Sequence, residues 1–216
     1  MKKLVIFDLD GTLLNTIADL AASTNQALQA FGFPTHPVEA YNYFVGNGIN
    51  KLFERALPED PRTQENIQKI RSSFVPYYNE HNHDLSNPYE GIPELLAALQ
   101  NEGVLLAVAS NKYQAATEKL VSYYFPAIRF VSVLGQREGI PTKPDARIVH
   151  ESMQQAGVHE AETLYVGDSN VDMQTAQNAG VDAVGVTWGF RPLSELEAYH
   201  PRYIAYKPAD VLTFLE

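Results

Sequence analysis

The sequence predicts an α/β protein with a doubly wound parallel sheet and a helical domain inserted after the first strand. Two observations predict the sheet: short runs of β-branched and apolar residues recur along the chain, and helical patterns separate most of them. The third observation is one long interval with helical patterns but no convincing strand, which predicts the insertion. The five β-rich runs are LVIFD (4–8), VLLAVAS (104–110), RFVSVL (129–134), TLYVGD (163–168) and DAVGVT (182–187).

The five runs have the composition of strands that are buried on both faces. They are almost continuously apolar, whereas strands with one face in water alternate between apolar and polar residues. An apolar stripe with helical spacing runs from Ile92 to Leu99, with Pro93 near its start, and residues 145–156 and 171–179 have the length of helices. With the runs numbered in chain order, we predict the Rossmann-like sheet order 3-2-1-4-5.

The long interval lies between the first and second runs and spans about ninety residues, more than a single crossover connection needs. We therefore predict an α/β core domain of residues 1–15 and 85–216, and a helical cap domain of residues 16–84. Three apolar stripes with helical spacing predict the cap helices: Ile17, Leu20, Ala21, Leu28 and Phe31; Ile49, Leu52, Phe53, Ala56 and Leu57; and Ile67, Ile70, Phe74 and Tyr77.

The composition is that of an ordinary globular protein and favours a small-molecule partner. The 16 Lys and Arg residues against 26 Asp and Glu residues give a formal net charge of −10, which argues against a nucleic-acid or acidic-membrane surface. An anionic substrate therefore needs a local positive site. The chain contains no cysteine, and the short apolar run before Asp8 is too short for a signal sequence. We expect a cytoplasmic monomer or homodimer.

Polar residues capable of chemistry follow the predicted strands. Ligands of open α/β sheets bind at the carboxyl ends of the strands, near the point where the strand order reverses. In the order 3-2-1-4-5 the first and fourth strands are neighbours across this point, so the residues after them should meet. These residues are Asp8 and Asp10 after the first strand, Ser110, Asn111 and Lys112 after the second, Lys143 between the third and fourth, and Asp168 and Asp172 after the fourth.

The residue types in this set favour phosphoryl chemistry with a magnesium ion. Carboxylates without histidine or thiolate select a hard cation, and Mg²⁺ binds through one or two carboxylates with water and substrate phosphate. A lysine beside hydroxyl or amide donors suits a phosphoryl group, and an aspartate can attack phosphorus while a second one transfers a proton. Each motif alone has a commoner explanation: Asp8-Leu9-Asp10 as a turn, Ser110-Asn111 as a helix N-cap, and Lys143 as a solvated loop residue. The convergence of four segments on one sheet edge favours the functional explanation.

The same residues resemble the four motifs of the haloacid-dehalogenase superfamily of phosphotransferases. The motifs are FDLDGT, the S-N-K sequence at 110–112, the isolated Lys143 and GDSNVD at 167–172, and the resemblance covers essentially the whole chain. The helical insertion matches the smaller helical cap type of that family. The resemblance implies Asp8 as nucleophile and Asp10 as general acid and base. It also implies Mg²⁺ held by Asp8, Asp168 and the backbone carbonyl of Asp10, with Asp172 supporting the metal indirectly, and phosphate bound by Ser110 and Lys143. We further predict Asn111 as a phosphate ligand and Lys143 as a catalytic residue.

Two longer segments look like the phosphoglycolate phosphatase branch of this family, VGNGINKLFERAL (45–57) and YEGIPELLAALQNEGVLLAVASNK (89–112). In that branch a glycine turn opens a cap helix whose N-terminus faces the substrate. The resemblance implies that the N–H groups of Gly48 and Ile49 hold a carboxylate or phosphate, and a helix start without a ligand stays open as the alternative. The chain departs from the family at Asn15-Thr16, where Asp-Ser is usual, and at Tyr113, where proline is frequent.

The resulting hypothesis is a Mg²⁺-dependent phosphomonoester hydrolase that acts through an aspartyl-phosphate, with 2-phosphoglycolate as the best single substrate. A sugar-phosphate mutase of the β-phosphoglucomutase type, a pyrophosphatase and a non-catalytic phospholigand-binding member are the alternatives. Family mutases tend to carry valine in place of Thr12 and histidine in place of Leu20, which favours hydrolysis here. A dehalogenase is disfavoured because that branch uses no metal and lacks the second acid, which is Asp10 in this chain.

Overall fold

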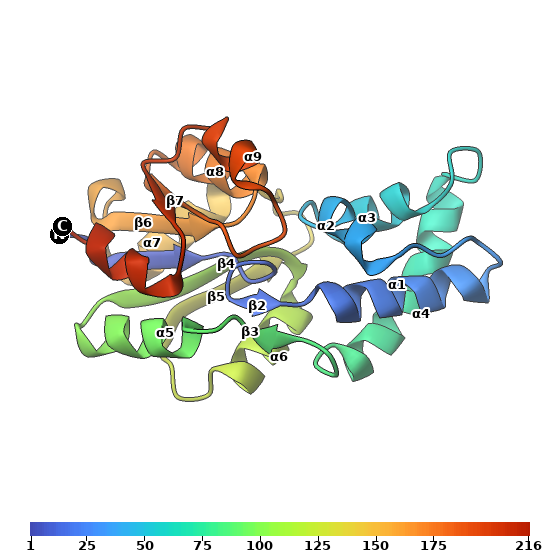
Figure 1. The fold of residues 1–216 in the computed structure, drawn as a ribbon, viewed down its shortest axis with the longest axis horizontal. Coiled ribbons are helices and arrows are strands. Elements are labelled where there is room, and N and C mark those ends of the chain that lie inside the picture. Colours follow the sequence, from blue (N-terminus) through green and yellow to red (C-terminus); the bar gives the residue numbers. More distant parts are fainter. The chain divides into compact units, whose positions relative to one another are not determined.

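The computed structural model describes residues 1–216, which divide into two compact units (Figure 1). The core unit comprises residues 1–15 and 88–216, and the helical unit comprises residues 16–87. The sequence placed the second boundary between residues 84 and 85. In the structure residues 85–87 belong to the helical unit. The Asp19 carboxylate of that unit accepts hydrogen bonds from Leu85 N at 3.0 Å and from Ser86 N at 2.8 Å.

The core unit contains a six-stranded sheet in which all neighbouring strands are parallel, in the order β5-β4-β1-β6-β7-β8. The predicted order of the five β-rich runs is confirmed, and β8 is an additional edge strand. The sequence missed β8 because it has three residues, of which only Ala205 is fully buried, so no long apolar run marks it. The strands are β1 (Leu4–Phe7), β4 (Leu105–Tyr113), β5 (Phe130–Gln136), β6 (Thr163–Gly167), β7 (Asp182–Val186) and β8 (Tyr203–Ala205).

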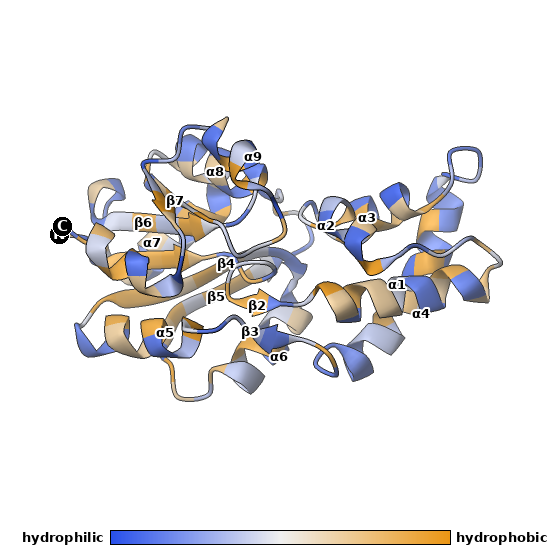
Figure 2. Cartoon of the chain, in the orientation of Figure 1, coloured by the Kyte–Doolittle hydropathy of each residue, from blue (hydrophilic) through white to orange (hydrophobic).

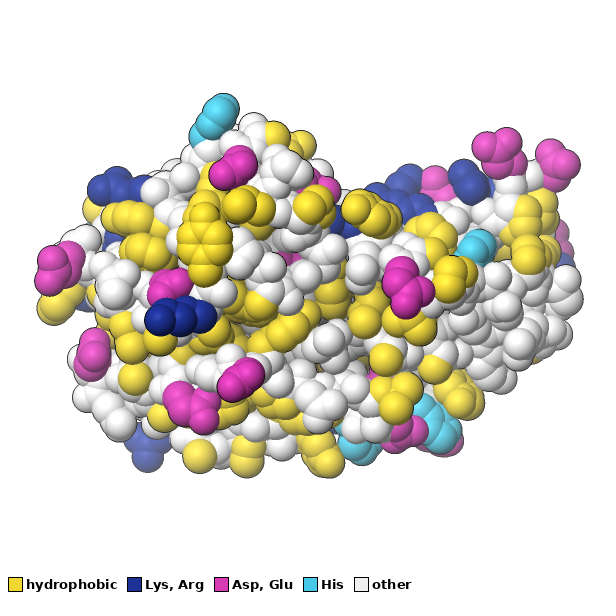
Figure 3. All heavy atoms as spheres, viewed as in Figure 1, with side chains coloured by type: hydrophobic (Ala, Val, Ile, Leu, Met, Phe, Trp, Pro, Cys, Tyr) yellow, Lys and Arg dark blue, Asp and Glu magenta, His cyan; other side chains and the backbone are white.

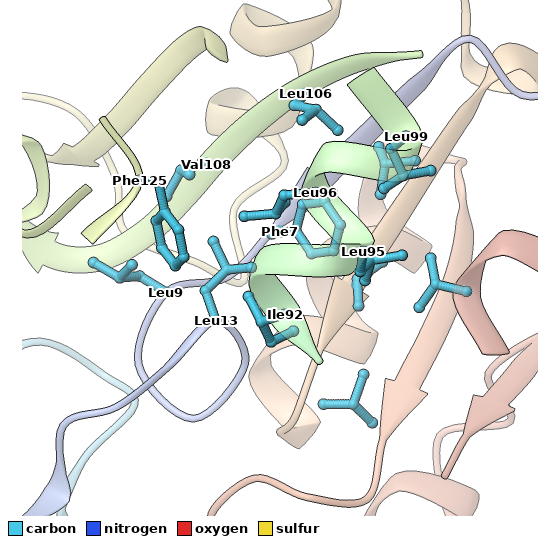
Figure 4. Packing of buried hydrophobic residues seen from close by; sticks show 14 of the residues in the cluster. Phe7, Leu9, Leu13, Ile92, Leu95, Leu96, Leu99, Leu106, Val108 and Phe125 are labelled. Atoms are coloured by element: carbon cyan, nitrogen blue, oxygen red, sulfur yellow. The ribbon is translucent and has the colours of Figure 1, made fainter. Parts of the chain in front are cut away.

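Helices cover both faces of this sheet, as the apolar runs predicted. Val5 and Phe7 of β1 pack into the cluster that contains α5 and α6, whereas Leu4 and Ile6 pack into the cluster on the opposite face. Figure 4 shows the first cluster, with Phe7 of β1 among the leucines of α5, and Figure 2 shows the strands as predominantly hydrophobic. The helices of this unit are α5 (Ile92–Asn101), α6 (Gln114–Tyr124), α7 (Arg147–Ala156), α8 (Asn170–Ala179) and α9 (Leu193–Glu197), with the 3₁₀ helices η2 (Glu160–Glu162) and η3 (Pro208–Phe214).

The helical unit is held together by an aromatic core. Phe74 lies between Phe53 and Tyr78, with ring centroids 5.0 Å away in each case. The structure buries Tyr78 where the stripe predicted Tyr77, and it leaves Phe31, the residue after α1, 42% exposed. The helices are α1 (Ile17–Ala30), α2 (Tyr41–Phe44), α3 (Ile49–Ala56) and α4 (Gln64–His81), with the 3₁₀ helix η1 (Val38–Ala40).

Two short strands, β2 (Leu14–Asn15) and β3 (Asn87–Pro88), pair at the points where the chain passes from one unit to the other. None of the helices has both the length and the apolar composition needed to span a bilayer. On the face drawn in Figure 3, charged side chains of both signs are scattered among apolar and neutral ones. A cluster of buried charged side chains lies inside the core unit, at the carboxyl ends of the strands.

Candidate active site

The carboxyl ends of β1 and β6 bring three buried carboxylates together. Asp8 follows β1 and Asp168 follows β6, while Asp172 lies in the first turn of α8. One carboxylate oxygen from each lies within 4.8 Å of the others. The parallel pairing of β1 with β6 explains this convergence, because both strands end at the same edge of the sheet. Three of the residues that the sequence grouped at this edge, Asp8, Asp168 and Asp172, therefore lie together.

Lys143 places its ammonium group among these acids. Its Nζ donates to Asp8 Oδ1 at 3.0 Å and to Asp172 Oδ1 at 2.8 Å. It also lies 3.0 Å from both the Ala109 carbonyl oxygen and the Tyr165 hydroxyl. Burial opposes the charge on this side chain, but Asp172 and Asp8 more than offset that effect and raise the pKa of the Lys143 ammonium well above its usual value. Lys143 is therefore a fixed positive charge at the site.

Asn111 holds the backbone of Lys143 in place. Its Nδ2 donates to the Lys143 carbonyl oxygen at 3.1 Å, and its Oδ1 accepts from the Lys143 N–H at 2.8 Å. Both ends of the Asn111 amide thus bind one peptide segment, which fixes the start of the Lys143 side chain. The sequence suggested a phosphate contact for Asn111 and missed this supporting role, and the phosphate contact stays a prediction.

Asp8 has the surroundings of a reactive carboxylate. Its Oδ1 accepts from Leu9 N at 2.7 Å and from Lys143, whereas its Oδ2 has no hydrogen-bond partner in the protein. Burial and the nearby Asp172 charge raise the pKa of Asp8 to about 7, although Lys143 lowers it. The negative charge at this position is therefore only partly compensated by the protein.

Asp172 and Asp168 differ in how their oxygens are used. Asp172 Oδ2 accepts from Ser169 N at 3.1 Å and Ser169 Oγ at 2.6 Å, which forms the capping box of α8. Its Oδ1 accepts from Lys143 and from the Tyr165 hydroxyl, so both oxygens are occupied. Asp168 Oδ2 accepts from Phe190 N at 2.7 Å, and burial with the charges of Asp172 and Asp8 raises its pKa well above the usual range.

The loop after β7 packs directly on Asp168, and sequence analysis missed it. A Cβ at Gly189 would lie 2.2 Å from the Asp168 Cβ and 2.4 Å from the Gly11 carbonyl oxygen, so only glycine allows this approach. The neighbouring Trp188 donates its indole N–H to the Thr12 carbonyl oxygen at 3.0 Å. The available signal was a glycine shortly after the last β-rich run of the sequence, because glycine permits a close approach of the backbone to its neighbours.

The end of β4 leaves the sheet ladder just where its polar residues begin. Ala109 pairs with Leu134 and Tyr113 pairs with Gln136, so β4 advances four residues while β5 advances two. This bulge turns residues 110–112 out of the regular pattern. Ser110 Oγ accepts from Lys112 N at 3.2 Å, which leaves its hydroxyl hydrogen for a ligand. The Lys112 Nζ lies 3.1 Å from Asp10 Oδ2, a pairing that sequence analysis did not assign.

Gly48 and Ile49 lie at the start of α3 in the helical unit. Gly48 has a φ of 83° and is the N-cap residue, as the glycine turn in the sequence indicated. Arg55 binds the loop before this helix, donating to Phe44 O at 2.9 Å and Asn47 Oδ1 at 2.8 Å. Hydrogen bonds from α3 therefore hold the loop before this helix in place. The predicted contact of Gly48 and Ile49 with substrate stays a prediction.

Comparisons with known proteins agree with this arrangement. The family model of the haloacid dehalogenase-like hydrolases matches residues 5–186. A phosphoglycolate phosphatase of Vibrio parahaemolyticus is 33% identical over 97% of this chain and 94% of its own length, and one of Agrobacterium fabrum is 36% identical over 91% and 86%.

Solved structures share the fold. A protein of Lactobacillus delbrueckii subsp. bulgaricus superposes with a TM-score of 0.92 at 31% identity, covering 100% of this chain and 99% of its own. A predicted phosphoglycolate phosphatase from Haemophilus somnus gives 0.90 at 28% identity, covering 100% and 98%. The chain therefore belongs to the haloacid dehalogenase-like hydrolases, and within that family it is similar to the phosphatases.

Proposed function

We propose that this hydrolase is a Mg²⁺-dependent phosphatase of small phosphate monoesters that works through a phosphorylated Asp8. The observation that carries the proposal is the free Oδ2 of buried Asp8 beside the fixed ammonium of Lys143. The carboxylate oxygen supplies a nucleophile, and the ammonium supplies the charge that a phosphoryl group needs. The names of the relatives support 2-phosphoglycolate as the substrate.

The donor set at the sheet edge fits a magnesium ion. All candidate ligands are carboxylate or carbonyl oxygens, which hard cations prefer. Burial, together with the neighbouring carboxylates, raises the pKa values of Asp8 and Asp168, and a bound divalent cation would favour their ionised forms. Asp8, Asp168 and the backbone carbonyl of Asp10 would hold the ion, whereas Asp172 would support it through its hydrogen bonds. A bound Mg²⁺ would withdraw negative charge from the phosphoryl oxygens.

The residues then divide the reaction between them. Asp8 Oδ2 attacks phosphorus, the bond from phosphorus to the ester oxygen breaks, and the Asp10 carboxyl gives its proton to the departing oxygen. Asp10 next takes a proton from water, which attacks the phosphorylated Asp8 and releases inorganic phosphate. Lys143 and the Ser110 hydroxyl bind the phosphoryl oxygens during both steps. The N–H groups of Gly48 and Ile49 are the candidates for binding the substrate carboxylate.

The experiment is phosphate release by the purified protein with Mg²⁺ and with a chelator. The substrates are 2-phosphoglycolate, 4-nitrophenyl phosphate and pyrophosphate, together with a hexose 1-phosphate and a bisphosphate primer. We expect Mg²⁺-dependent release with the highest kcat/KM for 2-phosphoglycolate, because this ratio measures substrate discrimination. Absence of Mg²⁺-dependent turnover contradicts the phosphatase, and isomerisation of the hexose phosphate would identify a mutase instead. A higher kcat/KM for pyrophosphate would contradict the substrate.

A further inference from the structure

We propose that Lys112 is a positioning residue that orients the Asp10 carboxylate for proton transfer. This inference rests on the proposed function, in which Asp10 exchanges protons with the ester oxygen and with water. Lys112 itself is assigned no contact with substrate. Its role is to hold the carboxylate that does the chemistry.

The first support is the contact itself. The Lys112 Nζ lies 3.1 Å from Asp10 Oδ2, and the two side chains are only 2% and 12% exposed. A lysine side chain normally keeps its ammonium in water, since burying it without a partner is strongly unfavourable. The pair is therefore an internal ion pair with a defined geometry rather than a mobile surface contact.

The second support is the anchoring of the Lys112 backbone. Its N–H donates to Ser110 Oγ at 3.2 Å, and its carbonyl oxygen accepts from Thr117 Oγ1 at 3.1 Å. A Cβ at Gly135 of β5 would lie 2.6 Å from that carbonyl oxygen, so the neighbouring strand passes close behind it. The bulge in β4 thus fixes where the Lys112 side chain starts, and the burial of that side chain limits the positions open to its ammonium.

The third support is that the two acids after β1, Asp8 and Asp10, contact different lysines. Lys143 contacts Asp8 and Asp172, whereas Lys112 contacts Asp10. Each of these two acids thus has a lysine of its own, and Lys112 is the partner that restrains rotation of the Asp10 side chain. Proton transfer requires the donor within hydrogen-bonding distance of the departing oxygen, and a displacement of about 1 Å can reduce the rate about 10²-fold.

The test compares Lys112→Met with Lys112→Arg and with Lys2→Met. Lys2 is also a buried lysine, paired with the partly exposed Asp182 at 2.6 Å, so its variant shows what the loss of a buried lysine and its ion pair does elsewhere in the core unit. Two substrates with Mg²⁺ separate the steps: 2-phosphoglycolate needs protonation of a poor leaving group, whereas 4-nitrophenyl phosphate has a good one. Steady-state rates and the initial burst of 4-nitrophenol are measured, with thermal melting to verify folding.

We expect Lys112→Met to lower kcat for 2-phosphoglycolate about 10²-fold with little change in KM. With 4-nitrophenyl phosphate, the burst should persist at about one equivalent of enzyme, because phosphorylation of Asp8 needs no proton there, while later turnovers slow down. Lys112→Arg should recover part of kcat, since it restores a cation near Asp10. Should Lys112→Met fail to fold, Lys112→Gln replaces it.

Other outcomes separate the two proposals. An increase in KM for 2-phosphoglycolate with unchanged kcat would place Lys112 on the substrate and refute the positioning role. An equal loss on both substrates with no burst, or a loss matched by Lys2→Met, would also refute it. If the wild type shows no Mg²⁺-dependent turnover, the proposed function itself fails, and no variant is needed to see it.

Discussion

Strand β1 has a buried lysine paired with an aspartate near each end, and the two ends differ in how their charges are balanced. At the amino end, Lys2 Nζ lies 2.6 Å from the Asp182 carboxylate and donates to the carbonyl oxygens of Ala161 and Thr163. At the carboxyl end, two lysines face a larger number of acids: Lys112 and Lys143 stand among Asp8, Asp10, Asp168 and Asp172.

The difference distinguishes a satisfied pair from the cluster that we propose as the active site. The ammonium at the amino end has three acceptors for its three donors, so nothing further is needed there. At the carboxyl end, burial and the proximity of the carboxylates to one another oppose ionisation and raise the pKa values of Asp8 and Asp168. A protein selected only for stability would not keep such a cluster, because buried like charges oppose folding. The cluster therefore supports the proposal that this end of the strand is the active site.

The largest expected effect comes from Asp8→Asn, which should remove turnover and stabilise the metal-free protein. Turnover should fall at least about 10³-fold because the nucleophile is lost. The pKa of Asp8 is about 7 in the folded protein against 3.8 in the unfolded chain, so the folded state binds the proton more tightly. Wild-type stability should therefore fall as the pH rises from about 4 to about 7, and the Asn variant should lack this contribution.

The measurement is thermal melting in a chelator at several pH values. At pH 8 the Asn variant should melt higher than the wild type, by about 2–4 °C for each kcal/mol gained, and the difference should shrink toward pH 4. Asp182→Asn is the matched control, because it removes the partner of Lys2 and should lower the melting temperature. A lower melting temperature for Asp8→Asn at pH 8 would contradict the charge imbalance.

The next largest effect is expected from Gly189→Ala. The new methyl group would meet Asp168 and the Gly11 carbonyl oxygen, so the loop after β7 must move away from the site. A shift of about 1 Å in Asp168 should reduce kcat/KM about 10- to 100-fold, and overpacking should cost about 1–3 kcal/mol of stability. Kinetics with titrated Mg²⁺ should show a weaker apparent affinity for the metal.

Gly185→Ala is its control on the same segment. A Cβ at Gly185 would lie 3.1 Å from the end of the Ile204 side chain and 3.3 Å from that of Leu196, both of which can adjust. Its kcat/KM should therefore stay near the wild-type value. Equal activity losses in the two variants would show that Gly189 has no specific role at Asp168.

Sequence reasoning located the acids of this site because they directly follow strands. Once the strand order was predicted, Asp8 and Asp168 had to lie at the same edge, and the parallel pairing of β1 with β6 confirms that order. The insertion was equally visible, since its helical periodicity interrupts the series of strands.

The supporting contacts could not be predicted in the same way. Lys112 reaches Asp10 because β4 has a bulge, and no local pattern in the sequence specifies a register shift against β5. Asn111 reads as a helix cap or a phosphate ligand, but it binds the backbone of Lys143, 32 positions away. Such contacts depend on how distant loops approach each other, which hydrophobic periodicity does not encode.

The smallest expected effect on activity is that of Lys2→Met, at the other end of β1. The variant leaves Asp182 without Lys2, but Asp182 is 25% exposed and also pairs with Arg202 at 3.2 Å, so its charge keeps a partner. We expect a loss of about 1–3 kcal/mol in the free energy of unfolding, below the value for a fully buried pair. The exposed Lys3 is the control, because its pair with Glu162 lies at the surface and Lys3→Met should change stability by at most about 1 kcal/mol.

The kcat/KM of folded Lys2→Met should stay within about twofold of the wild type, because the acceptors of Lys2 lie at the amino ends of the strands. A tenfold loss would show that the two ends of β1 are coupled, and the distinction between a structural end and a functional end would then be wrong.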